Sequence, residues 1–210
     1  MNKRMKKLTL ALSFLTLASP ALYATSVDLK GDAAAGQKKA AVCGACHGVE
    51  GNSLNPLWPN LAGQHASYIV QQLKGFQNKF RQDITMSPMA APLSEQDMLD
   101  LAAYFSSQTQ KLGEANPDMV ALGEKIYRGG NTETEIAACI ACHGPQGNGN
   151  PAAKYPIVSG QHAQYTHKQL MDYKSEVRKP EGNAIIMRDI ALKMSEAEMQ
   201  AVTDYMQGLY

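Results

Sequence analysis

The chain is poor in cysteine, in long apolar runs and in any excess of charge of one sign. Its 210 residues include four cysteines, and all four lie in two short motifs, so none remains as a separate thiolate ligand. No segment beyond the amino-terminal one is apolar enough to cross a bilayer. No basic block is present, so nothing indicates nucleic-acid binding. No sustained alternation of apolar and polar residues occurs, so a β-sheet is not expected.

Residues 1–24 have the pattern of a secretory signal peptide. Four basic side chains precede an apolar stretch over residues 8–18, and cleavage is expected near Ala24. The alternative is an uncleaved membrane anchor, although the apolar stretch is short for that role. Removing the signal leaves 16 of the 20 basic residues against 19 acidic ones, a net charge of −3. We expect an exported protein.

The sequence Cys-x-x-Cys-His occurs twice, at residues 43–47 and 139–143. This spacing is typical of covalent attachment of a c-type haem. Cys43 and Cys46, and likewise Cys139 and Cys142, would form thioethers with the porphyrin. The histidine that follows each pair would then bind the iron. The motifs therefore predict two covalently bound haem c groups.

Three other interpretations of the cysteine pairs are open. They are a zinc site, redox-active dithiols and two structural disulfides. A zinc knuckle needs no histidine directly after the second cysteine, yet both pairs have one. A thioredoxin-like dithiol would follow a strand, and no strand pattern flanks either motif. Haem attachment explains the spacing and the export signal together.

The two halves of the chain repeat each other over more than the haem motif. Gly63-Gln64-His65-Ala66 matches Gly160-Gln161-His162-Ala163, and a proline lies four residues before each glycine. Ser94 and Ser195 open matching segments near the end of each half. Ordered matches of this kind indicate a duplicated domain. We assign domain 1 to residues 25–108, a linker to 109–118 and domain 2 to 119–210.

Each half is predicted to be helical. Asp32 should cap a helix that runs to Val42, and a second helix should cover 65–76. Capping boxes at Ser94 and Ser195 should open the last helix of each half. Gly36 should lie where the first helix crosses the last near Tyr104, and Gly123 should lie correspondingly near Tyr205. Residues 129–135 are expected to form an inserted surface loop.

The second axial position of each iron decides the chemistry of the haem. A methionine there favours electron transfer, whereas an open position favours reactions with small ligands. His65 and His162 are rival ligands to a methionine. Both stand at predicted helix starts within a repeated turn, so we expect a structural role for them.

The export signal, the two haem motifs, the Gly-Gln-His-Ala-x-Tyr repeats and the segment that begins at Leu93 resemble those of the dihaem cytochrome c4 family. The resemblance covers essentially all of the mature chain. It implies an all-α fold of two tandem class I cytochrome c domains related by a pseudo-twofold axis, each wrapped around its haem. It implies His/Met ligation, with His47 and His143 as proximal ligands. It also places Pro59 and Pro156 in loops whose carbonyl groups orient those imidazoles.

The repeat selects the methionine in each half. Met86 lies eight residues before Ser94, and Met187 lies eight residues before Ser195. Met89 would correspond to Ile190, which cannot bind iron. Both methionines are expected in the loop before the last helix. We therefore predict Met86 and Met187 as axial ligands and Met89 as a pocket residue.

The resemblance implies a monomeric periplasmic carrier, peripherally associated with the membrane, that takes electrons from a respiratory reductase complex and delivers them to a terminal oxidase. On this interpretation the protein is not an enzyme. Two alternatives are a dihaem subunit of a flavoprotein dehydrogenase, for example one that oxidises sulfide, and a catalytic dihaem enzyme such as a peroxidase or a thiosulfate-oxidising enzyme. The catalytic alternative needs an open or unusually ligated iron.

Overall fold

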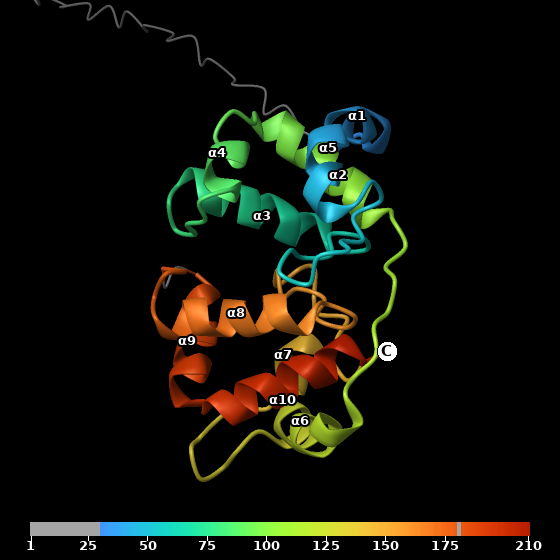
Figure 1. Ribbon diagram of the computed structural model, residues 1–210. Coiled ribbons are helices and arrows are strands. Elements are labelled where there is room, and N and C mark those ends of the chain that lie inside the picture. The colour runs from blue at the N-terminus through green and yellow to red at the C-terminus, as the bar shows by residue number, and fades with distance from the viewer. Residues whose placement is uncertain (1–29, 180–181) are drawn as a thin grey trace, which may run out of the picture.

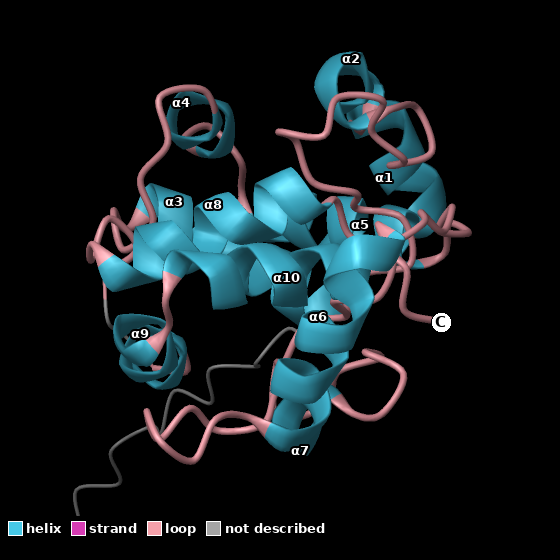
Figure 2. Ribbon diagram, turned by 60° about the horizontal axis from the view of Figure 1, so that its bottom comes forward, coloured by secondary structure: helices cyan, strands magenta, loops and turns pink. Residues whose placement is uncertain are grey.

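The computed structural model describes residues 30–179 and 182–210. Within these residues it contains ten helices and no strand, only isolated bridges. Figure 1 shows two domains stacked on each other, with α3 (Ala66–Gln77) and α8 (Ala163–Lys174) facing one another across the boundary. Figure 2 shows the same helices with loops between them. The all-α fold of two tandem cytochrome c domains is confirmed.

The two domains use equivalent helices in the same order. In domain 1 they are α1 (Ala33–Lys39), α2 (Ala41–His47), α3, α4 (Met86–Ala90) and α5 (Glu95–Ser106). In domain 2 they are α6 (Pro117–Gly129), α7 (Ile140–His143), α8, α9 (Ala184–Lys193) and α10 (Glu196–Gln207). The single helix predicted from Asp32 to Val42 is divided at Ala40, but its hydrogen bonds continue through that residue.

The helix starts follow the side chains that the sequence offers as caps. The Asp32 carboxylate accepts hydrogen bonds from the amides of Ala34 and Ala35. Both predicted capping boxes are confirmed: the hydroxyl of Ser94 pairs with Asp97, and that of Ser195 with Glu198. Each satisfies amide groups that the first helical turn leaves without an intrahelical partner.

Two glycines permit the central helix crossing of each domain, as predicted. A Cβ atom at Gly36 would lie 2.0 Å from the carbonyl oxygen of Asp100 and 2.8 Å from Tyr104 Cβ. At Gly123 it would lie 2.3 Å from the oxygen of Ala201 and 2.6 Å from Tyr205 Cβ. Helices α1 and α6 can therefore approach α5 and α10 closely enough to form the cores.

The segments that carry the candidate methionine ligands are helical, and the prediction of a loop there is wrong. Met86 begins α4, and Met187 lies inside α9. The Asp83 carboxylate caps the first of these helices by accepting from the amides of Thr85 and Met86. Residues 184–193 contain no glycine or proline, and six of the ten are strong helix formers (two Ala and one each of Leu, Met, Arg and Lys), which explains the second.

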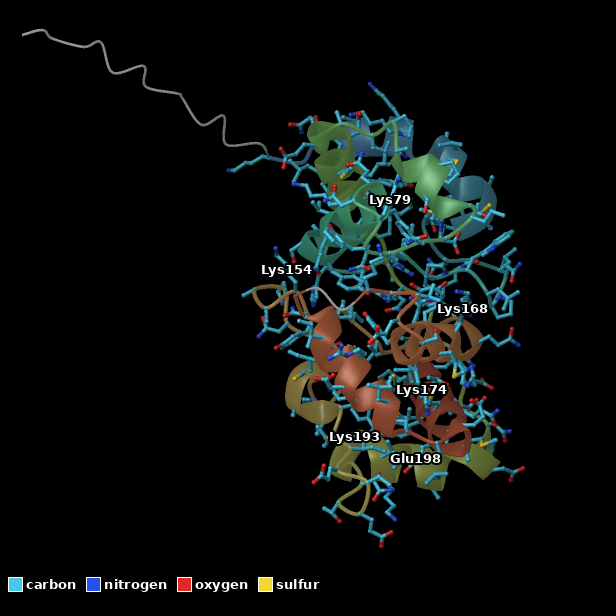
Figure 3. All side chains as sticks on the ribbon, turned by 90° about the vertical axis from the view of Figure 1, so that its left-hand side faces the viewer. Lys79, Lys154, Lys168, Lys174, Lys193 and Glu198 are labelled. Atoms are coloured by element: carbon cyan, nitrogen blue, oxygen red, sulfur yellow. The ribbon has the colours of Figure 1, made fainter. Side chains whose placement is uncertain are left out.

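The insertion before the second haem motif forms a surface loop as expected, but it starts later than predicted, because Gly129 ends α6 and Gly130 is buried. Residues 132–135 are exposed, and the backbone closes between Asn131 and Ile136. The Asn131 side chain donates to Glu198 Oε1 at 2.8 Å, and Lys193 pairs with Glu135 at 3.2 Å. Figure 3 labels Glu198 and Lys193 in the part of the molecule that includes this loop. The last two helices thus hold the insertion away from the domain boundary.

An extended segment joins the domains along one side of the molecule (Figure 1). Helix α6 begins at Pro117 behind an Asn116 cap, within the range expected for the linker. None of the helices in the described residues combines the length and the apolar character that a membrane span requires. The predicted signal peptide, residues 1–24, lies outside the described residues.

Candidate haem sites

Each Cys-x-x-Cys-His motif forms a helical turn that presents its three side chains together. In α2, Cys43, Cys46 and His47 stand at positions i, i+3 and i+4, which share one helix face. Cys139 caps α7, and Cys142 and His143 lie within that helix. In domain 1, the motif helix α2 and the methionine helix α4 lie on opposite sides of the domain. In domain 2, α7 and α9 do the same (Figure 2).

The motif histidines are buried and held by the predicted prolines. His47 is 6% exposed, and its Nδ1 lies 3.0 Å from the carbonyl oxygen of Pro59. His143 is 7% exposed, and its Nδ1 lies 2.9 Å from the oxygen of Pro156. The carbonyl group can only accept, so Nδ1 carries the hydrogen.

This hydrogen bond prepares each imidazole to bind a metal. Burial lowers the pKa of both histidines, and the positive charge of Arg81 lowers that of His47 further. Burial therefore favours the neutral ring, in which Nδ1–H is the donor and the lone pair lies on Nε2. A neutral imidazole with its second nitrogen anchored on a carbonyl is the usual form of a metal-binding histidine.

The four cysteines have the state that haem attachment requires. None of the four is joined in a disulfide, so the alternative of two structural disulfides has no support. Burial raises the pKa of the Cys43 thiol, and it raises the pKa of the Cys139 thiol to about 11. Cys43 and Cys139 also pack against the apolar core of their domains. Across the described residues no three histidine, cysteine or acidic side chains gather as a metal cluster, as a zinc site would need.

The three candidate methionines have different surroundings. Met86 is partly buried at the start of α4. Met187 is partly buried and packs against the core of domain 2 together with Cys139. Met89, predicted as a pocket residue, is 38% exposed. Both repeat-related methionines are thus partly buried, and their assignment as axial ligands stays a prediction.

The rival ligands His65 and His162 have the structural role expected of them. They cap α3 and α8. His65 Nε2 lies 2.8 Å from the carbonyl oxygen of Asn148, and His162 Nε2 lies 2.9 Å from that of Ser53. Each imidazole therefore joins its own domain to the other one.

Sequence reasoning missed a cluster of polar side chains at the domain boundary. Arg81 Nη2 donates to Gln169 at 2.8 Å, and Arg178 Nη2 donates to Gln72 at 2.7 Å. Each arginine also binds the glutamine of its own domain. Arg178 is buried, and within the described residues no carboxylate lies within 4.0 Å of either guanidinium. The arginines lie eighteen residues after Gly63 and Gly160, a repeat that could have revealed them.

The residues present fit two haem c groups. Each domain offers paired free thiols and one neutral histidine with its lone pair on Nε2. The boundary offers buried positive charge to which the carboxylates of haem are suited.

Comparisons with known proteins identify the family. The cytochrome c family matches residues 33–109 and 120–210. The chain is 44% identical to cytochrome c4 from Azotobacter vinelandii and 43% identical to that from Pseudomonas aeruginosa, and both alignments cover the whole of each chain. The crystal structure of reduced recombinant cytochrome c4 from Pseudomonas stutzeri is 46% identical, with a TM-score of 0.82, over 86% of this chain and all of that one.

The structure and these similarities lead to one assignment. Two cytochrome c domains imply two covalently bound haem c groups, at Cys43 and Cys46 and at Cys139 and Cys142. The helical architecture and the full-length similarity agree with this cofactor content. The chain therefore belongs to the cytochrome c4 family of dihaem electron-transfer proteins.

Proposed function

We propose that the protein carries electrons in the periplasm from a respiratory reductase to a terminal oxidase, one electron on each haem. The observation that carries this proposal is the repeated geometry in which a buried histidine is fixed by a proline carbonyl in both domains. Two rigid sites of the same design suit reversible oxidation and reduction of iron with little rearrangement. The predicted signal over residues 1–24 supports a periplasmic location.

His47 and His143 are the proximal ligands in this proposal, and Met86 and Met187 are the distal ones. The tautomer of each histidine supports the first pair, because Nε2 is left as the metal-binding nitrogen. Met86 and Met187 each lie eight residues before the capping serine of their domain, and this shared position supports them as the distal pair. Histidine and methionine together fill both axial positions, and they raise the potential of the haem.

Arg81 and Arg178 bind the carboxylates of the haem groups in this proposal. The boundary cluster supplies guanidinium groups held in place by Gln72 and Gln169. Arginine pairs favourably with carboxylates, so haem binding and domain association would stabilise each other.

We propose that the protein is a carrier and not an enzyme. With both axial positions occupied, neither iron has a position for peroxide or another small substrate. The domain boundaries at 25–108 and 119–210, with a linker over 109–118, belong to the same proposal. The alternative with the same haem sites is a subunit of a flavoprotein dehydrogenase. Such a subunit differs from a free carrier because it forms a stable complex with the flavoprotein.

Oxidation of the reduced protein by isolated membranes tests the proposed role. The holoprotein should be found in the periplasmic fraction of cells. Membranes that contain a terminal oxidase should oxidise it rapidly, and an oxidase inhibitor should abolish the reaction. Slow oxidation that the inhibitor leaves unchanged would contradict the role. Recovery of the protein in a stable flavoprotein complex would favour the alternative.

A further inference from the structure

Two equivalent glutamines reach across the domain boundary and clasp the opposite backbone. Gln161 Oε1 accepts from the Asn60 amide at 2.8 Å, and Gln161 Nε2 donates to the Asn60 carbonyl at 2.9 Å. Gln64 makes the same pair of bonds with Ile157, at 3.0 and 2.9 Å. Both glutamines are 7% exposed. We call these four bonds the reciprocal glutamine clasp.

The clasped peptide groups are those that hold the motif histidines. The carbonyl of Pro59 and the amide of Asn60 belong to one peptide unit. His47 Nδ1–H donates to the Pro59 oxygen of this unit. The Asn60 N–H of the same unit donates to Gln161 in the other domain. A continuous hydrogen-bonded chain therefore leads from His47 through one peptide unit to Gln161.

The second domain has the mirror-image chain. His143 Nδ1–H donates to the carbonyl of Pro156, and the amide of the same peptide unit, that of Ile157, donates to Gln64. Each motif histidine is thus connected to a glutamine of the opposite domain. The exchange of partners follows the pseudo-twofold relation between the domains.

Hydrogen bonds in such a chain strengthen one another. When the amide of a peptide unit donates to an acceptor, its carbonyl becomes a better acceptor in turn. A better acceptor at Nδ1–H makes Nε2 of the imidazole more basic and therefore a stronger donor to a metal. The clasp is buried, so water does not compete strongly with these bonds.

We propose that Gln161 is a positioning residue for the haem of domain 1 and Gln64 for the haem of domain 2. Each glutamine acts through the peptide unit and histidine of the opposite domain, and lowers the midpoint potential of the haem there by favouring ferric iron. The inference rests on the proposed proximal ligation by His47 and His143. It extends that proposal by making the domain boundary a determinant of both potentials.

The experiment measures both haems in the holoproteins Gln161→Met and Gln64→Met. Methionine has nearly the same length as glutamine but does not replace its amide. NMR of histidine-labelled reduced protein reports the Nδ1–H resonances of His47 and His143, and a redox titration followed by NMR gives each midpoint potential. Gln161→Met should move the His47 resonance upfield and raise the potential of haem 1 only. Gln64→Met should do the same to His143 and haem 2.

The matched control is Gln110→Met. Gln110 Nε2 donates to the Ser159 carbonyl at 2.8 Å, so this variant loses a boundary hydrogen bond but leaves both clasped peptides intact. It should move neither resonance. Gln161→Glu keeps an acceptor oxygen at the clasp and should hold the His47 resonance at or downfield of its original position. If Gln161→Met yields no holoprotein, Gln161→Glu provides the test in its place.

Three outcomes would overturn the inference. They are unchanged resonances in both glutamine-to-methionine variants, equal changes at the two haems in either variant, and the same changes in Gln110→Met. Failure of the proposed function is distinguishable from these results. It would appear in the unaltered protein, as carbon monoxide binding or as the absence of histidine ligation, before any clasp variant is compared.

Discussion

At the scale of single residues, the identity of the distal ligand separates an electron carrier from a haem that binds small molecules. Met86 and Met187 are related by the repeat, and both are partly buried. Met89 lies only one helical turn away from Met86, yet it is 38% exposed. Substitution of these neighbours therefore distinguishes a ligand from a nearby side chain.

Met86→Ala should remove the methionine-to-iron charge-transfer band of one haem, lower its potential and allow it to bind carbon monoxide. Met89→Ala should leave the band intact, since its side chain is exposed. Visible and near-infrared spectra of the two holoproteins check this. Loss of the band in Met89→Ala but not in Met86→Ala would show that the repeat was aligned wrongly.

Gly36→Val should sharply reduce the yield of holoprotein, because even a Cβ atom there would lie 2.0 Å from the Asp100 carbonyl oxygen. Helix α1 would have to move away from α5, and the core between them would open. Gly129→Ala is the control, since no atom lies within 4 Å of its added Cβ. Haem absorbance per unit of expressed chain measures both. Equal yields would contradict the close crossing.

At the scale of helices, local signals in the sequence specify where the elements begin. The capping boxes and the glycine crossings were predictable, because each depends on residues a few positions apart or on a repeated spacing. Helices α4 and α9 were not predicted. The sequence around Met86 contains Pro88 and two serine or threonine neighbours, which resemble loop residues until Asp83 caps the segment.

Ser195→Ala should lower the free energy of unfolding by about 1 kcal/mol, the usual effect of losing a helix cap. The Ser195 hydroxyl accepts from the Glu198 amide, and the same glutamate also holds the inserted loop through Asn131. Ser195→Thr keeps the oxygen and should recover most of the loss. Denaturant unfolding of the holoproteins measures this. A threonine variant as unstable as the alanine variant would contradict the capping explanation.

Acid should affect helix α5 through the ion pairs that join it to Lys39. Lys39 lies 2.6 Å from both Asp97 and Asp100, and its hydrogen bond is the main reason that the pKa of Asp100 falls to about 2. A lowered folded-state pKa stabilises the protein above the ordinary value of 3.8. This stabilisation is lost as the pH falls from about 4 to 2.

Lys39→Met should therefore be less stable than the unaltered protein at pH 6, with the difference narrowing towards pH 2. Thermal unfolding of the holoproteins at several pH values measures the difference. Lys38→Met, which changes an exposed neighbour, should follow the unaltered protein. If the stability difference between Lys39→Met and the unaltered protein stayed constant from pH 6 to pH 2, it would contradict the ion-pair explanation.

At the scale of the whole molecule, the duplication was predictable but the contacts between the copies were not. The same order of motifs in the two halves predicts two similar domains and similar sites within them. The clasp between Gln161 and Asn60 joins residues about 100 positions apart, and no local pattern specifies such a pair. His65 and His162, in the same turns as the two glutamines, could be recognised as structural. Their hydrogen bonds across the domain boundary could not be predicted.

The central claim is that each domain contains a six-coordinate haem with a histidine and a methionine ligand. An optical redox titration of the purified holoprotein, performed with and without carbon monoxide, tests it most directly. We expect two high-potential transitions, two haems per chain and no spectral change with carbon monoxide. A haem that binds carbon monoxide in the unaltered protein, or a low-potential transition, would contradict it.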